Sequence, residues 1–292
     1  MSEKNETRLR RTLLFVPGAD PKRFSKAIES GADTILFDLE DSVSIELKVE
    51  ARKNVVGELQ NRSNQNVELA VRINAPSTPY FQEDLEEVVK AGADAILIPK
   101  SENPGVLNSI AKDILEKSGK DIKVLALVET ALGVTQVNSI ASLESKIDAI
   151  CFGHADFSLD MGLTNSDASK GVIYHARCSI AIAARAYKIS PIDNVCLAVK
   201  DEEAFRQDVA IGISLGFEGK LCIHPTQARI ANEMYTPTDD QIGYANRVLD
   251  GWNKAQLEGK GVFTLDNKMV DAPIVALQNK ILNRAKKAGK IL

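Results

Sequence analysis

The sequence predicts an α/β protein, a closed (β/α)8 TIM barrel followed by a C-terminal helical extension. One observation is a repeated unit, Gly-Ala-Asp followed by an apolar strand and then charge, at 30–41 and 91–102, with looser copies at 145–156 and 215–226. A second is the alternation of eight apolar, strand-like runs with helix-length segments, which favours a parallel sheet closed on itself. A doubly wound open sheet is the alternative, but no GxGxxG follows the first run.

The eight apolar runs are expected to be strands, and the segments between them helices. A segment such as FQEDLEEVVKA repeats its apolar residues at three- and four-residue spacing, as an amphipathic helix does. The barrel domain is then expected to cover residues 1–230, and the helical extension residues 231–292. The expected strands are 13–18, 35–41, 69–74, 95–100, 124–130, 149–156, 194–199 and 220–225.

Composition excludes several classes of function. The 292 residues are 44% hydrophobic and 26% charged with a net charge of −4, which argues against bulk nucleic-acid binding. No apolar run approaches the length of a membrane span, and the start, MSEKNETRLRR, lacks the apolar core of a signal peptide. The four cysteines form no CxxC pair and have no obvious base, so we expect buried, reduced thiols rather than a nucleophile. We therefore expect a cytoplasmic protein without nucleic-acid or membrane partners.

Polar or charged residues end nearly every expected strand. In a parallel barrel these C-terminal strand ends line the mouth, where active sites lie. The stretch LFDLEDSV places three carboxylates within four residues there, which costs desolvation and repulsion unless a positive group is held nearby. The strand-end residues are Asp38, Arg72, Lys100, Glu129, Asp156 and His224.

Glu129 and Asp156 end the fifth and sixth expected strands, so they should be neighbours on the rim. Two carboxylates with several waters are the usual protein share of an Mg²⁺ site, whereas the alternative is that each residue caps the following helix. Arg72 either pairs with the acids of the second strand or binds a substrate carboxylate or a developing oxyanion. His154 and His224 have no partner at metal-ligand spacing, which favours structural hydrogen bonding.

A basic cluster surrounds the first strand. It is either a solvated face or, because it lies beside a Pro-Gly turn that opens a helix, a site for phosphate groups. Its members are Arg10, Arg11, Lys22, Arg23 and Lys26.

Several motifs together resemble a known family. They are RRTLLFVPGADPKRFSKA, FDLEDSV, VRINAP, ILIPKSE, ALVETALGV, ARCSIAIAARA, LGFEGKLCIHPTQ and GVFTLDNKMVDAP. In this order they are similar to the citrate lyase β-subunit-like (citryl-CoA lyase and malyl-CoA lyase) family of the HpcH/HpaI aldolase superfamily. The resemblance runs from residue 10 to residue 285.

The resemblance implies an Mg²⁺-dependent carbon–carbon lyase that cleaves a 3-hydroxy-carboxyacyl-CoA by a retro-Claisen reaction. The substrate would be of the citryl-, citramalyl- or malyl-CoA type, and the products acetyl-CoA and a 2-keto acid. One alternative is a citrate lyase β subunit that acts on citryl-acyl carrier protein within a complex, and another is a metal-dependent acyl-CoA thioesterase. The keto acid, the stereochemistry and the thioester carrier stay open.

The resemblance also implies roles for individual residues. Glu129 and Asp156 would hold the metal beside the substrate, and Arg72 would contact the substrate. Glu40 and Asp41 would hold metal-bound waters and orient Arg72.

Four further residues, Phe15, Lys26, Ile223 and His224, fall where related malyl-CoA lyases contact coenzyme A. Asp271, in KMVDAP, matches an aspartate that reaches into a neighbouring subunit's site and returns a proton to the enolate carbon. The resemblance therefore implies a homotrimer, or a multiple of it, in which the extension packs on a neighbouring subunit. The alternative for Asp271 is that it caps the final helix, with Pro273 in the first turn.

The sequence departs from the citrate lyase β subunit itself at two places and from a related lyase at a third. Ala155 stands where that subunit has an acidic residue before the metal aspartate, and His224-Pro225 stands where it has Asn-Pro. Asp20 occupies the position of a phosphate-binding arginine in a related lyase. These differences weigh against citrate as the substrate and against an acyl carrier protein as the carrier.

Overall fold

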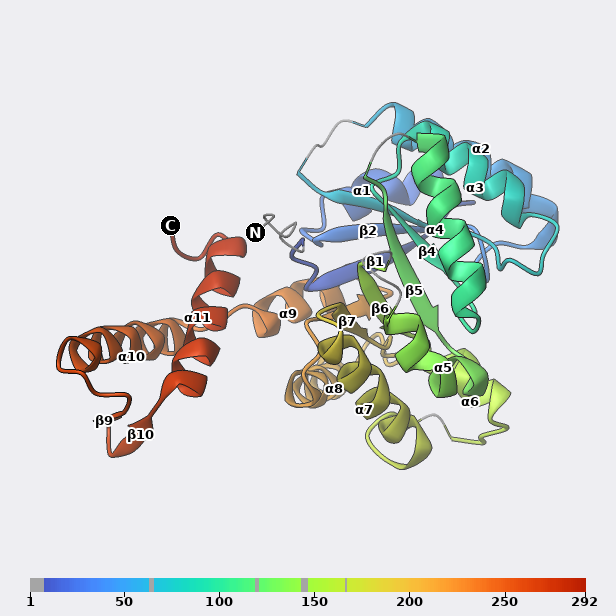
Figure 1. Cartoon of the computed structure of the whole chain (residues 1–292). Helices are drawn as coiled ribbons and strands as arrows, with labels where there is room; N and C mark the ends of the chain where they lie inside the picture. Colours follow the sequence, from blue (N-terminus) through green and yellow to red (C-terminus); the bar gives the residue numbers. More distant parts are fainter. Residues whose placement is uncertain (1–7, 63–65, 119–120, 143–146, 166) are drawn as a thin grey trace. The chain divides into compact units, whose positions relative to one another are not determined.

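The computed structural model describes residues 8–62, 66–118, 121–142, 147–165 and 167–292 (Figure 1). These residues form two compact units that divide between Asn232 and Glu233. Among the described residues, no helix is both long and apolar enough to cross a membrane. All four cysteines are free thiols; Cys151 and Cys222 are buried as expected, whereas Cys178 and Cys196 are partly exposed.

The described residues of the first unit form a closed barrel of eight parallel strands in chain order. The barrel closes where Leu13 of the first strand pairs with Leu221 of the last. The predicted (β/α)8 fold is therefore confirmed. The strands are β1 (Thr12–Pro17), β2 (Thr34–Asp38), β3 (Glu68–Arg72), β4 (Ala95–Ile98), β5 (Lys123–Val128), β6 (Ala149–Phe152), β7 (Ser190–Asp193) and β8 (Gly219–Cys222).

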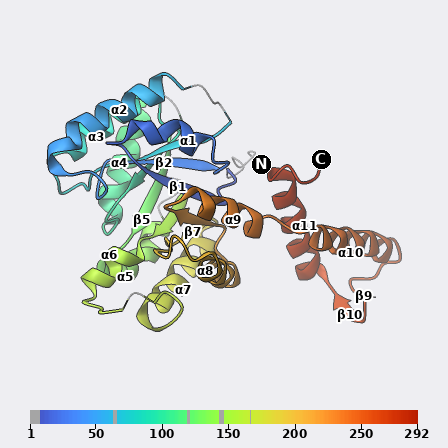
Figure 2. The ribbon, with the colours of Figure 1, turned by 180° about the vertical axis from the view of Figure 1, so that it is seen from behind.

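Helices follow the strands and surround them, as both views of the ribbon show (Figures 1 and 2). In Phe81–Ala91 the apolar residues Leu85, Val88 and Val89 face the barrel and are buried, and Gly92 ends the helix at φ 88°. Only glycine adopts that angle without strain, so the Gly-Ala-Asp motif marks the helix end. The helices are α1 (Phe24–Ile28), α2 (Lys48–Gln60), α3 (Phe81–Ala91), α4 (Pro104–Ser118), α5 (Ala131–Ala141), α6 (His154–Asp160), α7 (Gly171–Ala186), α8 (Glu202–Leu215) and α9 (Pro225–Tyr235), with short 3-10 turns η1 (Pro21–Arg23) and η2 (Ile45–Leu47).

The interior of the barrel is filled by side chains rather than open. Alternate residues of the strands point inward, so every strand contributes to one buried cluster. Because this cluster closes the barrel axis, a ligand can bind only at an end. The cluster contains Leu13, Leu36, Ala70, Ala95, Leu97, Leu125, Leu127, Ala149, Cys151, Ile192 and Leu221.

Arg10 and Arg11 precede β1 and lie at the end of the barrel opposite the mouth. Arg10 is buried and forms an ion pair with Glu68, 2.7 Å from Nε to Oε2, and a second with Asp148. Arg11 pairs with Asp33 at 2.6 Å. These two arginines join the bottoms of the strands, so including them in a phosphate site was wrong.

The seventh strand is not the predicted one. β7 covers residues 190–193, and the predicted run 194–199 is the loop that follows it. Pro191 has no backbone N–H to donate to a neighbouring strand, so the sequence SPID does not read as a strand. In the loop, Val195 packs against the interior cluster, whereas Leu197 is 57% exposed. The apolar residues of this loop therefore do not share one buried strand.

The second unit is a helical hairpin with a small sheet. It contains α10 (Asp239–Leu257), the antiparallel strands β9 (Phe263–Leu265) and β10 (Lys268–Val270), and α11 (Ala272–Lys287). Asp266 and Asn267 both have positive φ, as the tight turn of a two-residue hairpin requires. Val248, Val270 and Val275 form its buried core. The predicted helical extension thus also contains a β-hairpin between its two long helices.

Candidate active site

A cavity of about 810 Å³ opens at the C-terminal ends of the strands. Residues from seven strand ends and the segments that follow them line it, which agrees with the mouth expected for a parallel barrel. The residues that line the cavity include Phe15, Arg23, Lys26, Asp38, Asp41, Arg72, Glu129, Asp156, Val195, Ile223 and His224.

Arg72, the last residue of β3, is held by the acids that follow β2. Its Nε and Nη2 donate to the two carboxylate oxygens of Asp38 at 2.6 and 2.7 Å. Its Nη1 lies 3.1 Å from Glu40 and 3.0 Å from Asp41, and the guanidinium stacks over Phe15 with 4.9 Å to the ring centroid. The predicted pairing with the second strand is therefore present, but the bidentate partner is Asp38, which the sequence reasoning did not select as a site residue.

Asp38 is built to stay ionised. Besides Arg72 it accepts hydrogen bonds from the backbone N–H groups of Glu40 and Ser42 at 2.9 and 3.1 Å. Burial alone would raise its pKa, but the charge and hydrogen bonds of Arg72 outweigh burial and lower the pKa. A fixed carboxylate of this kind keeps the guanidinium plane in one orientation.

Glu129 directly follows β5 and is buried below the mouth. Its Oε1 accepts a 2.8 Å hydrogen bond from the backbone N–H of Lys100, whose φ of 48° is rare for a residue other than glycine. Gly153 leaves the space for this carboxylate, since a Cβ there would come within 2.6 Å of Glu129 Oε2. Burial and the negative charge of Glu40 raise the pKa of Glu129 to about 8.

Glu40 is also buried, and its Oε2 makes no hydrogen bond of good geometry although Arg72 Nη1 lies 3.1 Å away. The ammonium group of Lys100 is 3.6 Å from Oε1. Burial raises the pKa of Glu40 to about 7, despite the opposing charge of Arg72. Lys100 therefore reaches this site twice, through its backbone to Glu129 and through its side chain to Glu40.

Asp156 lies in the first turn of α6 and is half-buried. Burial and the charge of Asp41 raise its pKa. Neither Asp156 nor Glu129 is an N-cap, because Gly153 and Thr130 hold those positions, and Thr130 Oγ1 accepts from the N–H of Gly133 at 3.0 Å. The helix-capping alternative was wrong for both acids.

Burial raises the pKa values of Glu40, Glu129 and Asp156, and the negative charge of neighbouring carboxylates raises them further. A hard divalent cation would relieve that repulsion, and carboxylate oxygens are the ligands it prefers. Among the described residues no three His, Cys, Asp or Glu side chains converge as a complete metal cage. Two carboxylates that leave the other positions to water and substrate oxygens fit Mg²⁺, which keeps several waters.

The four residues expected to contact a carrier, Phe15, Lys26, Ile223 and His224, all line the same cavity. Lys26, on α1, is exposed, and His224 Nδ1 accepts from the N–H of Thr226 at 3.2 Å. Asp20 pairs with the exposed Arg23 at 2.7 Å.

His154 departs from the expected structural hydrogen bonding. It is buried, and its Nδ1 finds no hydrogen-bond partner among the described residues. It lines a separate cavity of about 310 Å³ between α6, α8 and the loop after β7. Asp38, Asp41, Arg72, Glu129 and Asp156 thus line one cavity. Glu40 and Lys100 contact these residues but are not part of the cavity lining, and His154 is outside the group.

Comparison with known proteins shows the family to which the chain belongs. Residues 11–225 match the family described as HpcH/HpaI aldolase/citrate lyase. The chain belongs to this family. It is 36% identical to the citrate lyase subunit β of Leuconostoc mesenteroides subsp. cremoris, over 96% of this chain and 95% of that one. It is 32% identical to the L-malyl-CoA/β-methylmalyl-CoA lyase of Rhodobacter capsulatus, over 96% of each.

A solved structure is similar over nearly the whole chain. It is the protein CitE from Mycobacterium tuberculosis in complex with magnesium, acetoacetate and coenzyme A. The TM-score is 0.81 at 28% identity, and the match covers 96% of this chain and all of that one.

In this member of the HpcH/HpaI family, Asp271 is the N-cap of α11. Its Oδ1 accepts from the N–H of Ile274 at 3.3 Å, and Pro273 lies in the first turn, as the capping alternative predicted. A cap uses only one carboxylate oxygen, so this contact is compatible with a second role for Asp271.

Two residues of the mouth were missed as site residues. Asp38 pairs in register with Arg72 across β2 and β3, so the adjacency of the two predicted strand ends was a usable signal. Lys100 has a positive φ and donates its backbone N–H to Glu129, and nothing in the sequence indicates that conformation.

Proposed function

We propose that this protein is a Mg²⁺-dependent carbon–carbon lyase that cleaves a 3-hydroxy-carboxyacyl-CoA to acetyl-CoA and a 2-keto acid. The observation that carries the proposal is one cavity lined by an arginine, itself held by three acids, and by two further carboxylates, the buried Glu129 and the half-buried Asp156. Family membership supports the reaction class. Substrates of the citryl-, citramalyl- and malyl-CoA type all present the required hydroxyl and carboxylate.

Glu129 and Asp156 would hold the metal, and Glu40 and Asp41 would hold its waters. When bound, Mg²⁺ acts as a Lewis acid toward the hydroxyl and carboxylate oxygens of the substrate. Glu129 is kept in place by the N–H of Lys100, so it needs no reorganisation to serve as a ligand. The magnesium bound by the similar Mycobacterium tuberculosis protein supports this assignment.

Arg72 would bind the substrate carboxylate and stabilise negative charge on the departing keto-acid oxygens. Asp38 accepts from its Nε and Nη2, and Asp41 accepts from its Nη1 at 3.0 Å, so these acids hold the guanidinium in place at the cavity. Glu40, with a pKa of about 7 and an oxygen free of good hydrogen bonds, is suited to accept the hydroxyl proton as the C–C bond breaks. Asp271 would then donate a proton to the acetyl enolate.

The test is product analysis with citryl-, citramalyl- and malyl-CoA, with Mg²⁺ and after treatment with EDTA. At least one substrate should give acetyl-CoA and a keto acid in equal amounts, and EDTA should abolish the reaction until Mg²⁺ is returned. Free CoA thiol released without a keto acid would instead identify a thioesterase. No turnover of any of the three would contradict the proposal.

A citrate lyase β subunit that uses an acyl carrier protein is the second candidate, and 36% identity to such a subunit favours it. The exposed Lys26 at the cavity distinguishes the two. If CoA phosphates bind there, Lys26→Glu should raise KM for the acyl-CoA about tenfold at low salt, and the effect should shrink as salt screens the charges. Lys53→Glu, on the exposed part of α2, is the matched control.

An unchanged KM for CoA esters in Lys26→Glu protein, together with efficient use of a citryl-acyl carrier protein, would favour the subunit function. We also propose that the enzyme is a cytoplasmic homotrimer or a multiple of it. In that assembly residues 231–292 pack on a neighbouring subunit and bring Asp271 to its site.

A further inference from the structure

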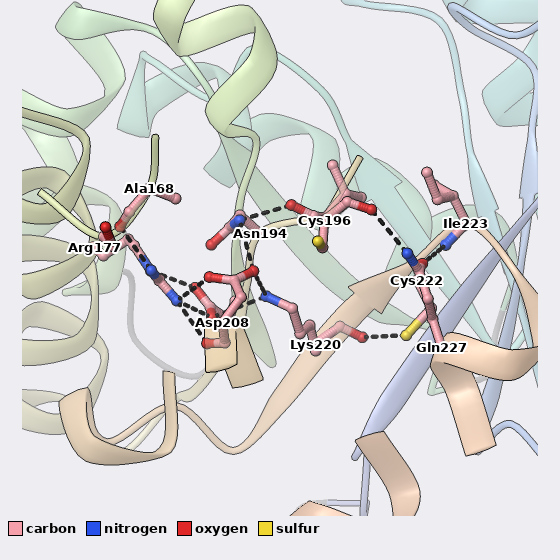
Figure 3. Close-up of polar contacts among 12 residues, drawn as sticks. Ala168, Arg177, Asn194, Cys196, Asp208, Lys220, Cys222, Ile223 and Gln227 are labelled. Carbon is pink, nitrogen blue, oxygen red and sulfur yellow. Dashed lines mark hydrogen bonds and ion pairs between the residues drawn. The ribbon is translucent and has the colours of Figure 1, made fainter. Parts of the chain in front are cut away.

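Gln227, in the first turn of α9, joins two loops of the cavity wall. Its side chain is buried, with 2% exposed. Oε1 accepts from the backbone N–H of Ile223 at 3.0 Å, and Nε2 donates to the backbone carbonyl of Cys196 at 2.8 Å (Figure 3). One amide therefore links the loop after β8 to the loop after β7.

The loop after β7 is fixed at its start by a different set of contacts. Asn194 Nδ2 donates to the carbonyl of Val195 at 2.7 Å. Buried ion pairs join the preceding residue, Asp193 of β7, to Arg177 and to Lys220 of β8, at 2.6 and 3.2 Å. Asp193, directly before the loop, is thus held by buried ion pairs. At Cys196 the loop is joined to α9 by Gln227.

Gln227 binds the backbone of Ile223 itself and of Cys196, the residue after Val195. Val195 and Ile223 both line the mouth cavity. Their side chains are apolar, whereas the carboxylate and hydroxyl end of the proposed substrate requires the charged residues after β2, β3, β5 and β6. The apolar wall therefore suits the part of the thioester that does not react, namely the arm of its carrier.

We propose that Gln227 is a positioning residue that sets the spacing between Val195 and Ile223 and thereby the affinity for the carrier arm of the thioester. This inference rests on the proposed function. A glutamine performs this task because it offers one acceptor and one donor on the same planar group, and the two loops present one backbone N–H and one backbone C=O.

Gln227→Met keeps the length and volume of the side chain and removes both hydrogen bonds. We expect KM for the acyl-CoA, and Kd for CoA measured by calorimetry, to rise about tenfold, with kcat changed less than about twofold, because two bonds to the loops are lost. Gln207→Met is the matched control, since Gln207 is exposed on α8 and its Nε2 donates to Glu203 on the same helix at 3.0 Å.

Gln227→Glu tests the hydrogen bonds independently of side-chain loss. A protonated carboxyl group retains one acceptor and one donor, whereas the ionised form has no donor and repels the carbonyl of Cys196. Burial raises the pKa of a carboxyl group, so the ratio of variant to wild-type KM should fall toward one as the pH is lowered from about 8 to about 6. A merely structural loss would give a ratio that does not change with pH.

The inference is overturned if folded Gln227→Met protein binds CoA as the wild type does, or if kcat falls while KM stays unchanged. It is also overturned if the Gln227→Glu ratio is independent of pH. Wild-type protein that cleaves none of the three thioesters would instead contradict the proposed function, and calorimetry with CoA alone would still report on Gln227.

Discussion

Glu129→Gln protein is expected to lose lyase activity by about a thousandfold or more, because a metal that polarises the substrate supplies several kcal/mol of transition-state stabilisation. Glutamine preserves the shape of the side chain, and its amide oxygen can still accept from the N–H of Lys100. The loss would therefore report on the charge needed to bind the metal. Steady-state rates with saturating Mg²⁺ and the best thioester measure it.

Stability measurements separate this effect from unfolding. The folded-state pKa of Glu129 is raised from 4.5 to about 8, so the metal-free folded protein binds more protons than the unfolded chain between these values. The contribution of Glu129 to the free energy of unfolding is then fully present below pH 4.5 and is lost as the pH rises through about 8. Glu129→Gln cannot ionise, so without metal it should be at least as stable as the wild type, and increasingly so at higher pH.

Glu116→Gln, an exposed residue on α4, is the matched control and should keep full activity. Asp156→Asn is expected to match the loss seen for Glu129→Gln. Substantial activity of Glu129→Gln protein in the presence of EDTA would show that the metal hypothesis is wrong.

The mouth of the barrel could be predicted from sequence because its side chains follow strands that are strongly apolar. Glu129 and Arg72 are fixed to the rim by the strands before them, and parallel strands bring their ends to one side. The prediction of the seventh strand was wrong for two reasons. Pro191 disfavours a strand at residues 190–193, and the six residues that follow have the apolar composition of a strand. The function of Arg10 was misjudged because its partner Glu68 lies 58 residues away, a contact that local patterns do not reveal.

Within the site, residue types were easier to predict than pairings. One acid ends β2 and two follow it, and only the β2–β3 register, in which Asp38 lies opposite Arg72, decides which of the three makes the bidentate contact. The position of Lys100 depends on a φ of 48°, and that of Gln227 on two loops meeting around α9. Such contacts depend on tertiary geometry. The types of side chain at the rim could therefore be predicted from the sequence, but not the contacts that hold them in place.

The proposed shared site predicts that two inactive variants restore activity in one another. Asp271→Asn removes the proton donor while asparagine keeps the N-cap of α11, so the extension should fold normally. Glu129→Gln removes the metal ligand and leaves Asp271 intact. We expect each variant alone to be inactive as a homotrimer.

Co-expressing the two variants with different affinity tags, and purifying through both tags, isolates mixed trimers. In a cyclic trimer of either mixed composition, one interface of three pairs an intact Glu129 with an intact Asp271 from the next subunit, so about one third of the wild-type activity should return. If Asp271 instead acted on the barrel of its own chain, every chain would carry one defect and mixing would restore nothing. Activity from a monomeric fraction would likewise contradict a shared site. The recovered fraction therefore distinguishes a site completed by a neighbour from one completed within the chain.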